Sequence, residues 1–456
     1  MRIIILLLIQ CYVVSVFAQE RVRYTNLEEA LENPKEVYWL DLSNKYLTEL
    51  SADIKQFKNL EELNLSWNAL TSLPPEIGAL IQLEKLSIRA NKLKKLPAEI
   101  LQLPNLKHLE ISYNNLSDLP IGIGKLTQLK YLEINNNKLT TLPVEIGQLS
   151  NLKKIDIGNN SLTSLLPSIG QLHQLEILWL ESNELTTLPV EIGLLTSLKS
   201  LDILSNNLEY LPPEIGQLNQ LEDISLRMNE LSELPLEMGQ LVSLVYLDIS
   251  NNNLEHLPVE IGQLIKLESF SAQNNKLINL PVELFQLKKL KSLDFQGNSI
   301  TDLPQEIEQL TKLEDLNFCW NKLRGLPNLS QLSNLTDLDL EGNYLDHIPV
   351  EIFQLTALKR LDLEGNNLSS IPKEISQLIN LSTLDLEGNK LTQLPVEIGD
   401  MSNLRKLYLN ENQLTDLPVE IGQLLKLTEI NIEDNRLSSE EKTKIEKLLP
   451  RCRIYD

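Results

Sequence analysis

The sequence is poor in the residues on which cross-linked, metal-binding and nucleic-acid-binding proteins depend. Its 456 residues include 3 cysteines, 4 histidines and 5% aromatic residues, and 41 basic residues stand against 63 acidic ones, a formal net charge of −22. Nucleic acids and anionic membrane surfaces attract a basic protein surface, so neither is an expected partner. A protein partner with a basic surface, or a cation, remains compatible with this charge.

Motifs for catalysis or cofactor binding are also missing. The four histidines fall in different parts of the chain, and none lies at metal-ligand spacing from another histidine or a cysteine. No G-x-x-x-x-G-K, H-E-x-x-H or G-x-S-x-G motif occurs. We therefore expect no metal, no cofactor and no enzymatic activity; an enzyme would need a site that motif reasoning does not reveal.

The only long apolar run lies at the N-terminus. Residues 1–18 combine an early basic residue with an apolar stretch and end at Ala18 before Gln19, the pattern of a cleaved secretory signal. A membrane span needs about 20 apolar residues, whereas this stretch is shorter and is interrupted by Gln10. We therefore expect export to the envelope, the periplasm or the medium. A lipid attached to Cys11 is an alternative.

A phrase of 23 residues recurs from residue 60 almost to the C-terminus. One copy, residues 129–149, reads LKYLEINNNKLTTLPVEIGQL. Its L-x-x-L-x-L segment alternates apolar and polar residues and predicts a short strand, and L-P-x-E-I-G-x-L then returns along the outer side. Repeats of this length stack into solenoids, so we predict one elongated α/β domain without a linker.

The asparagine that follows each strand has a predicted structural role. The strand ends in a sharp turn whose buried backbone groups need partners, and an amide offers both donors and an acceptor. The later proline fixes φ, and the glutamate two residues beyond it faces the positive end of a short helix, so these columns are scaffold. The intervals are 23 residues, except for 22 before Asn343; the asparagines are Asn68, Asn91, Asn114, Asn137, Asn160, Asn183, Asn206, Asn229, Asn252, Asn275, Asn298, Asn321, Asn343, Asn366, Asn389, Asn412 and Asn435.

The repeat also excludes a disulfide between the two cysteines that follow the signal. Cys319 and Cys452 lie five repeats apart, which at about 4.8 Å per stacked strand separates them by roughly 24 Å. A disulfide needs Cα atoms within about 7 Å. Capping of the solenoid ends must therefore rely on helices.

Short helices are predicted at both ends. Thr25 with Glu28, and Ser438 with Glu441, have capping-box spacing before apolar stripes that would shield the terminal leucines. We therefore expect no appended catalytic or membrane domain. The predicted parts are a signal peptide at 1–18, an N-terminal helical cap at 19–36, a solenoid of 18 repeats at 37–437 and a C-terminal helical cap at 438–456.

These residues resemble the leucine-rich repeat proteins over about residues 37–437. The L-P-x-E-I-G-x-L phrase is similar to a subclass shared by Ras-linked intracellular scaffolds and many bacterial proteins, and the signal and end helices make secreted bacterial members most similar. The resemblance implies a curved horseshoe with a parallel β-sheet on the concave face and short helical or 3-10 segments on the convex face. It also implies protein–protein recognition through the concave face. An intracellular, Ras-suppressor-like regulatory scaffold is the alternative if the N-terminus does not export the chain.

The outward residues of the strands, two, four and six places before each asparagine, are the expected binding surface. Most are polar, so large apolar side chains among them are candidate anchors of an interface. Tolerated drift in a redundant repeat is the alternative explanation. The anchor candidates are Tyr131, Ile177, Trp179, Leu204 and Tyr246, with Met228 near the sheet edge.

Three repeats that read LDLEGN place carboxylates in two columns. Carboxylates about 4.8 Å apart repel by roughly 0.9 kcal/mol even at the dielectric constant of water, so a basic partner or a cation would relieve them. Lys359 and Arg360 supply part of this relief, and duplication of solvated charges is the alternative explanation. We name these residues the acidic track: Asp339, Asp362 and Asp385 in one column, and Glu341, Glu364 and Glu387 in the other.

One repeat is shorter than the rest. Residues 324–332, which read RGLPNLSQL, lack one residue and the glutamate of the outer segment. We expect a local bend there, beside an exposed Trp320 and an exposed Cys319.

Overall fold

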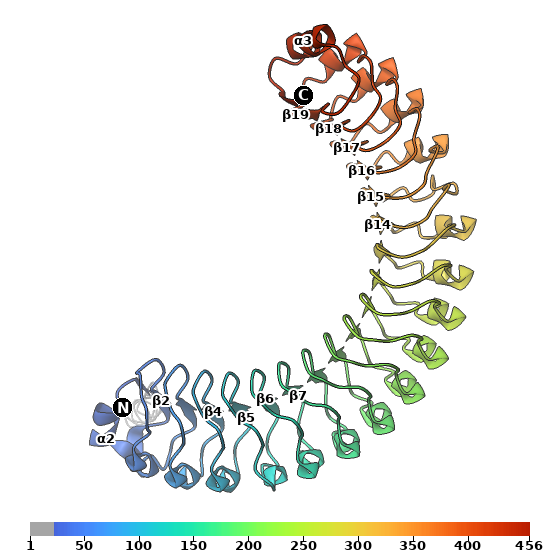
Figure 1. Cartoon of the computed structure of the whole chain (residues 1–456). Coiled ribbons are helices and arrows are strands. Elements are labelled where there is room, and N and C mark those ends of the chain that lie inside the picture. Colours follow the sequence, from blue (N-terminus) through green and yellow to red (C-terminus); the bar gives the residue numbers. More distant parts are fainter. Residues whose placement is uncertain (1–21) are drawn as a thin grey trace, which may run out of the picture. The chain divides into compact units, whose positions relative to one another are not determined.

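The computed structural model describes residues 22–456, and the predicted signal of residues 1–18 lies outside them. The chain divides into two compact units: an N-terminal unit that ends at Glu184 and a C-terminal unit that begins at Leu185. In each unit the strands line one side of a stack of repeats and the 3-10 segments line the other (Figure 1). We call these sides the sheet face and the outer face.

The N-terminal unit contains a parallel sheet with one short strand per repeat. Strand partners are 23 residues apart, as Leu63 beside Leu86 shows. The middle residue of a repeat strand is a buried leucine or isoleucine and its neighbours point outward, as the L-x-L alternation predicts. The strands are β1 (Arg23–Tyr24), β2 (Trp39–Asp41), β3 (Glu62–Asn64), β4 (Lys85–Ser87), β5 (His108–Glu110), β6 (Tyr131–Glu133), β7 (Lys154–Asp156) and β8 (Ile177–Trp179).

The C-terminal unit repeats this arrangement, again with parallel pairing. The strands are β9 (Ser200–Asp202), β10 (Asp223–Ser225), β11 (Tyr246–Asp248), β12 (Ser269–Ser271), β13 (Ser292–Asp294), β14 (Asp315–Asn317), β15 (Asp337–Asp339), β16 (Arg360–Asp362), β17 (Thr383–Asp385), β18 (Lys406–Tyr408), β19 (Glu429–Asn431) and β20 (Arg453–Tyr455). The predicted parallel sheet is therefore confirmed within each unit.

The outer segments are 3-10 helices of three or five residues, in agreement with the predicted return phrase. In η6 the preceding Pro143 has a φ of −68°, and Glu145 lies in the first turn, as expected. The segments of the N-terminal unit are η1 (Pro34–Glu36), η2 (Ala52–Gln56), η3 (Pro75–Ala79), η4 (Ala98–Gln102), η5 (Ile123–Lys125), η6 (Val144–Gln148) and η7 (Pro167–Gln171). Those of the C-terminal unit are η8 (Val190–Leu194), η9 (Pro213–Gln217), η10 (Leu236–Gln240), η11 (Val259–Gln263), η12 (Val282–Gln286), η13 (Gln305–Gln309), η14 (Val350–Gln354), η15 (Lys373–Gln377), η16 (Val396–Asp400) and η17 (Val419–Gln423).

Within residues 22–456, two α-helices lie where the sequence predicts end helices. Helix α3 (Ser439–Leu448) begins with the expected cap, because Ser438 Oγ accepts a hydrogen bond from the Glu441 backbone N–H at 3.2 Å. Helix α2 (Leu27–Glu32) is capped by Asn26, whose Oδ1 accepts from the N–H of Glu28 and Glu29. The predicted capping box at Thr25 is therefore wrong by one residue, since the asparagine amide reaches the same free N–H groups.

The asparagines form the predicted ladder of buried hydrogen bonds. Asn91 Nδ2 donates to the carbonyl oxygens of Leu65 at 3.0 Å and Ile88 at 3.1 Å, and its Oδ1 accepts from the Leu70 N–H at 3.0 Å. One side chain thus joins its own turn to the preceding repeat. In the first repeat the position is occupied by Lys45, whose N–H donates to Asn68 Oδ1 at 3.0 Å.

The short repeat loses its outer segment and keeps its strand. No 3-10 helix forms between η13 and η14, yet β14 and β15 remain paired in register, with Asp315 beside Asp337. Asn343 Oδ1 still accepts from the Leu323 N–H at 3.0 Å. Trp320 is exposed as expected, whereas Cys319 is buried against the next repeat, so its predicted exposure is wrong.

Candidate recognition surface on the sheet

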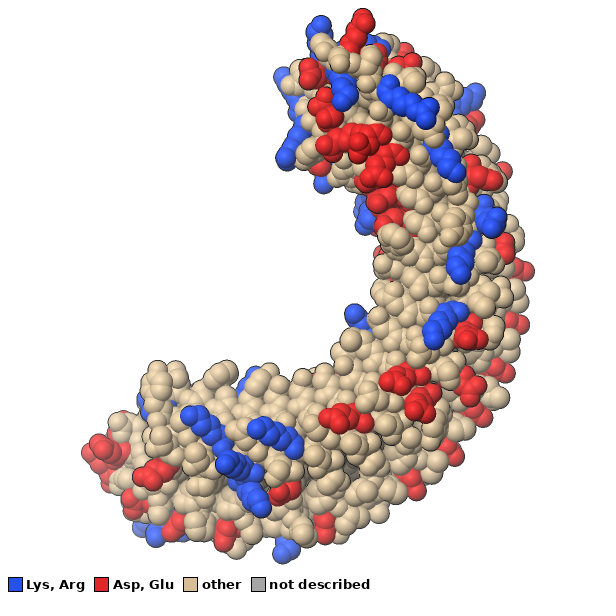
Figure 2. Space-filling view, in the orientation of Figure 1, with Lys and Arg blue, Asp and Glu red and all other residues tan. Residues whose placement is uncertain are grey.

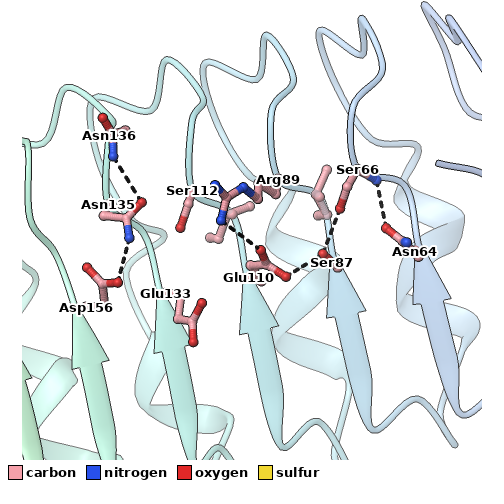
Figure 3. A network of polar contacts seen from close by, with 12 residues as sticks. Asn64, Ser66, Ser87, Arg89, Glu110, Ser112, Glu133, Asn135, Asn136 and Asp156 are labelled. Atoms are coloured by element: carbon pink, nitrogen blue, oxygen red, sulfur yellow. Dashed lines mark hydrogen bonds and ion pairs between the residues drawn. The ribbon is translucent and has the colours of Figure 1, made fainter. Parts of the chain in front are cut away.

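Side chains of neighbouring repeats meet diagonally on the sheet face. The residue two places before an asparagine lies just beyond its strand, and it contacts the residue four places before the next asparagine. Asn135 Nδ2 donates to Asp156 Oδ2 at 2.6 Å, and Ser66 Oγ lies 2.7 Å from Ser87 Oγ (Figure 3). Polar contacts of this kind link neighbouring repeats on the sheet face, and apolar side chains stand out among them.

In the N-terminal unit, the three anchor candidates surround one lysine. Lys154 lies between Tyr131 and Ile177 in the strand register. Its Nζ is 4.0 Å from the ring centroid of Trp179 and 3.3 Å from Glu133 Oε1. All three anchor candidates are half-buried. The structure thus brings Tyr131, Ile177 and Trp179 together, but one face of the indole carries a cation–π contact rather than facing solvent.

An aromatic platform continues from this group. The rings of His108 and Tyr131 stack with centroids 4.3 Å apart. Burial, helped by the positive charge of Lys85, lowers the pKa of His108. The lowered pKa favours the uncharged imidazole at pH 7, and its ring extends the aromatic surface of Tyr131.

In the C-terminal unit, the candidates lie on β11 and in the turns after β9 and β10. Leu204 is half-buried, and Met228 is 49% exposed with a left-handed φ of 56°. The Tyr246 hydroxyl donates to Asp248 Oδ2 at 3.4 Å, and Asp223 is its neighbour on β10. Burial and these two carboxylates raise the pKa of Tyr246 to about 12. The six predicted anchors therefore form two groups, one in each unit.

A second set of exposed aromatic residues was not among the anchor candidates from the sequence, although Trp320 was expected to be exposed. The residue immediately before each asparagine of the ladder has a left-handed backbone, which turns its side chain outward. At this position Trp67 is 61% exposed, Tyr113 47% and Trp320 57%. Left-handed φ favours asparagine and glycine, so bulky aromatics there are unusual. Their position next to the asparagine was the available signal.

The aspartates of the acidic track accept hydrogen bonds from the backbone. Asp339, Asp362 and Asp385 are register neighbours on β15, β16 and β17. Each accepts, through Oδ1, a hydrogen bond of 3.0–3.2 Å from the backbone N–H two residues later. This bond ends the strand and explains why L-D-L recurs. The glutamate column makes no such backbone bond in the described chain, and Figure 2 shows acidic side chains gathered over this part of the C-terminal unit.

One arginine partly neutralises the track. Arg360 Nη2 lies 2.9 Å from Asp362 Oδ2 and 3.8 Å from Asp339 Oδ2. Burial together with the neighbouring carboxylates nevertheless raises the pKa of Asp339 to about 6, and the pKa values of Glu364 and Asp385 to about 7. The track therefore holds more carboxylates than its own cation can stabilise.

Two groups in or beside the track bring possible metal-ligand atoms within 4.8 Å of one another. One group is Cys319, Asp339 and Glu341, and the other is Asp362, Glu364 and Asp385. Burial, reinforced by Asp339 and Glu341, raises the pKa of the Cys319 thiol, so the sulfur is protonated and a poor ligand at neutral pH. The second group has the oxygen donors that hard cations prefer.

Sequence profiles of one family match most of the chain. The profile described as Leucine rich repeat matches residues 81–139, 265–323, 333–391 and 379–437, and the profile described as Leucine-rich repeat region matches residues 121–209. No curated protein matches the chain. Among residues 22–456, no helix has the length and apolarity needed to cross a bilayer.

Solved structures extend this similarity over nearly the whole chain. A leucine-rich repeat protein of Leptospira interrogans is 39% identical over 95% of this chain and 100% of its own, with a TM-score of 0.72. The plant peptide hormone receptor RGFR1, solved in complex with RGF2, is 34% identical over 88% of this chain and 68% of its own, with a TM-score of 0.76. YopM from Yersinia enterocolitica is 26% identical over 91% of this chain and 90% of its own, with a TM-score of 0.64.

These matches agree with the architecture of each repeat, which consists of a strand, an asparagine-ladder turn and a 3-10 return segment. Repeat solenoids of this type present a long sheet face and typically serve as protein-interaction modules. The chain belongs to the leucine-rich repeat family.

Proposed function

We propose that the chain is an exported bacterial recognition protein that binds another protein through its sheet face. The observation that carries the proposal is the group of Tyr131, Ile177 and Trp179 around Lys154, since large aromatic side chains on an otherwise polar face are typical anchors of interfaces. Leu204, Met228 and Tyr246 supply a second group in the C-terminal unit. Similarity to a Leptospira interrogans protein over the full length of that protein supports a bacterial origin.

The acidic track indicates the charge of the partner. Its glutamates, which make no backbone bond in the described chain, are half-exposed, and Arg360 lies beside the neighbouring aspartates and offsets only part of the negative charge. A partner that placed lysine or arginine side chains over them would relieve this repulsion and associate faster. We therefore include a basic surface in the proposed partner.

Binding should be tested with variants on both faces. The mature chain would capture its partner, and the affinity of the identified partner would then be measured for Trp179→Ala, Leu204→Ala and the outer-face control Val144→Ala, whose side chain is also exposed. We expect each sheet-face variant to weaken binding by more than about 1 kcal/mol and the control to leave it unchanged. Trp179→Phe, which keeps a ring beneath Lys154, should lose less than Trp179→Ala. Equal affinity for all variants would show that the partner does not bind at these residues.

Export is tested separately by the N-terminal residue of the protein recovered from its native host. A start at Gln19 in the envelope or medium fits the proposed signal. An intact Met1 in the cytoplasm would favour the regulatory scaffold instead. A lipid on Cys11 would place the protein on a membrane surface by an anchor rather than a span.

A further inference from the structure

The sheet face of the N-terminal unit is hollowed over β2 to β5. The hollow has a volume of about 290 Å³ and is separate from the residues around Trp179. Its floor is low because Ser66 and Ser87 stand where other repeats carry larger side chains, such as Leu204 at the position that corresponds to Ser66. Ligand sites for small molecules begin at about 300 Å³, so the hollow has room for one or two ring-sized groups.

The donor and the acceptor of each hydrogen bond in the floor of the hollow can be assigned. Ser87 Oγ donates to Glu110 Oε2 at 2.7 Å, and Arg89 Nη1 lies 3.8 Å from Glu110 Oε1 (Figure 3). Since Ser87 has given its only proton to Glu110, Ser66 must donate to Ser87 at 2.7 Å. Ser66 Oγ is therefore left with acceptor capacity, while Asn64 uses its Oδ1 for the Ser66 N–H and keeps its amide protons for another acceptor.

Two tryptophans stand at the rim of the hollow. Trp39 lies half-buried on β2, and Trp67 lies in the turn after β3 with a left-handed φ of 57° and 61% of its side chain exposed. Arg89, which also lines the hollow, packs over the ring of Tyr113 at 4.7 Å. The rim thus offers flat apolar faces beside fixed polar groups, a combination suited to ligands that have both kinds of surface.

The charges that line the hollow cancel. Arg23 is paired with Asp41, Arg89 is paired with Glu110, and Lys85 is the register neighbour of Glu62. An anionic ligand would meet a carboxylate beside each cation, and a basic peptide would meet a cation beside each carboxylate. A neutral ligand that carries both donors and acceptors can use both partners of each pair.

We infer that this hollow binds a neutral saccharide. Sugar hydroxyls donate and accept, so they match the alternating groups of Asn64, Ser66 and the Arg89–Glu110 pair. The C–H faces of a sugar ring pack against indole, which gives Trp67 and Trp39 a role. This site lies on other strands than the proposed protein contact and adds a second ligand class to the sheet face.

The test begins with an array that carries neutral oligosaccharides of glucose, galactose, mannose and N-acetylhexosamines beside sulfated and sialylated ones. We expect binding to one or more neutral members. The affinity of the bound sugar would then be measured by tryptophan fluorescence or calorimetry. Binding to none of the neutral members, or to the charged members alone, would overturn the inference.

Matched variants assign the binding to the hollow. Trp67→Ala should weaken binding about tenfold or more, while Trp320→Ala, which removes a tryptophan at the same repeat position with 57% exposure and a φ of 54°, should leave it unchanged. Ser66→Leu should abolish binding by filling the hollow with a residue that the fold already accepts at Leu204. The unfolding temperature of each variant shows that it is folded. Full binding by both Trp67→Ala and Ser66→Leu would reject the site.

Discussion

At the scale of single residues, the asparagine ladder joins the repeats through one amide each. Asn252 Nδ2 donates to the carbonyl oxygens of Leu226 and Ile249, both at 3.0 Å, and its Oδ1 accepts from the Leu231 N–H at 3.0 Å. All of these backbone groups are inaccessible to water in the packed turn. The side chain thus meets a hydrogen-bonding need that no apolar residue could meet.

Loss of this amide should be costly. We expect Asn252→Ala to lower the free energy of unfolding by about 2–4 kcal/mol, because it leaves several buried backbone groups without partners. Asn253→Ala is the control, since Asn253 is adjacent and half-exposed. Urea denaturation of both variants measures their free energies of unfolding. Equal losses would show that the hydrogen bonds of the ladder asparagine add no stability beyond that of an ordinary surface asparagine.

The ladder was predictable from the sequence, whereas the outward aromatics beside it were not. The spacing of Asn252 and its equivalents fixes a turn, and the need for donors and an acceptor then fixes their role. The residue before each asparagine adopts a left-handed φ, which alternation of polar and apolar residues does not reveal. Trp67 and Trp320 were therefore not expected on the binding surface.

At the scale of elements, the outer 3-10 segments pack so closely that several of them require glycine. A Cβ added at Gly262 would lie 2.4 Å from the backbone oxygen of Glu283 in the next repeat. The recurring glycine of E-I-G-x-L therefore serves packing on the outer face. Gly325, in the short repeat without an outer helix, has no atom within 4 Å of an added Cβ.

These two glycines should respond differently to the same substitution. We expect Gly262→Ala to destabilise the protein by about 1–3 kcal/mol through overpacking. Gly325→Ala should be neutral or stabilise by about 0.5 kcal/mol, because alanine restricts the unfolded chain. Thermal or urea denaturation measures the stability of each variant. If Gly262→Ala left the stability unchanged, neighbouring outer segments would have to move apart at little cost.

The acidic track should make stability depend on pH. Carboxylates whose folded-state pKa is raised to about 7, as for Glu364 and Asp385, hold a proton that the unfolded chain loses near about pH 4. Between these values the folded state binds more protons, so stability falls as pH rises. We expect a lower unfolding temperature at pH 8 than at pH 5, measured by calorimetry.

A double variant isolates this contribution from other acidic groups. Glu364→Gln combined with Asp385→Asn keeps the side-chain shapes and the Oδ1 that ends the strand, and it should reduce the difference between pH 5 and pH 8. Glu397→Gln in η16 on the outer face removes a charge elsewhere and should leave the difference unchanged. An unaltered profile in the double variant would contradict the raised pKa values.

The short repeat shows which part of a repeat can be shortened. The deletion near Arg324 removes a 3-10 segment, while β14 and β15 keep their pairing. A strand is hydrogen-bonded on both sides, so a change within it would disturb two neighbours, whereas an outer segment makes its backbone hydrogen bonds within its own repeat, as Ile307 N–H does to Pro304 O. The sequence located the deletion in the outer segment but did not show that the 3-10 helix would be lost entirely.

At the scale of the whole molecule, stability rests on stacked leucines and asparagines without covalent links between the described repeats. Cys319 and Cys452 are both free, as their separation in the sequence predicts. Cys319 is buried, and burial raises the pKa values of both thiols, to about 11 for Cys452. Both sulfurs are therefore protonated and slow to react.

A reductant such as dithiothreitol should leave the unfolding temperature unchanged, because both cysteines are free. A melting temperature that falls with dithiothreitol would reveal a disulfide that the structure does not contain.

Iodoacetamide should label Cys319 only after denaturation, because the folded repeat shields the protonated thiol. Mass spectrometry of the alkylated chain measures the labelling. Cys452 is partly exposed and provides the internal comparison.

The periodic sequence predicted most of the fold and less of the surface. Repeat length, strand, asparagine and outer segment follow from residues that recur, and the structure confirms them. The hollow beside Trp67 and the lysine beneath Trp179 depend on pairs of residues in different repeats, which a single repeat does not show. The terminal strands β1 and β20 were also missed, because two or three residues with mixed polarity carry no periodic signal.

Those terminal strands cover the last repeat strand at each end of the described ladder. β1 pairs with β2 through Arg23 and Tyr24, and β20 pairs with β19 through three residues that begin at Arg453. Every repeat presents the same open ladder to the next, so a bare end would accept a repeat of another molecule as readily as one of its own. The outermost strands of the described chain, β1 with two residues and β20 with three, each carry an arginine. Charged residues on an edge strand disfavour its pairing with another chain, so we expect these arginines to oppose end-to-end association of copies.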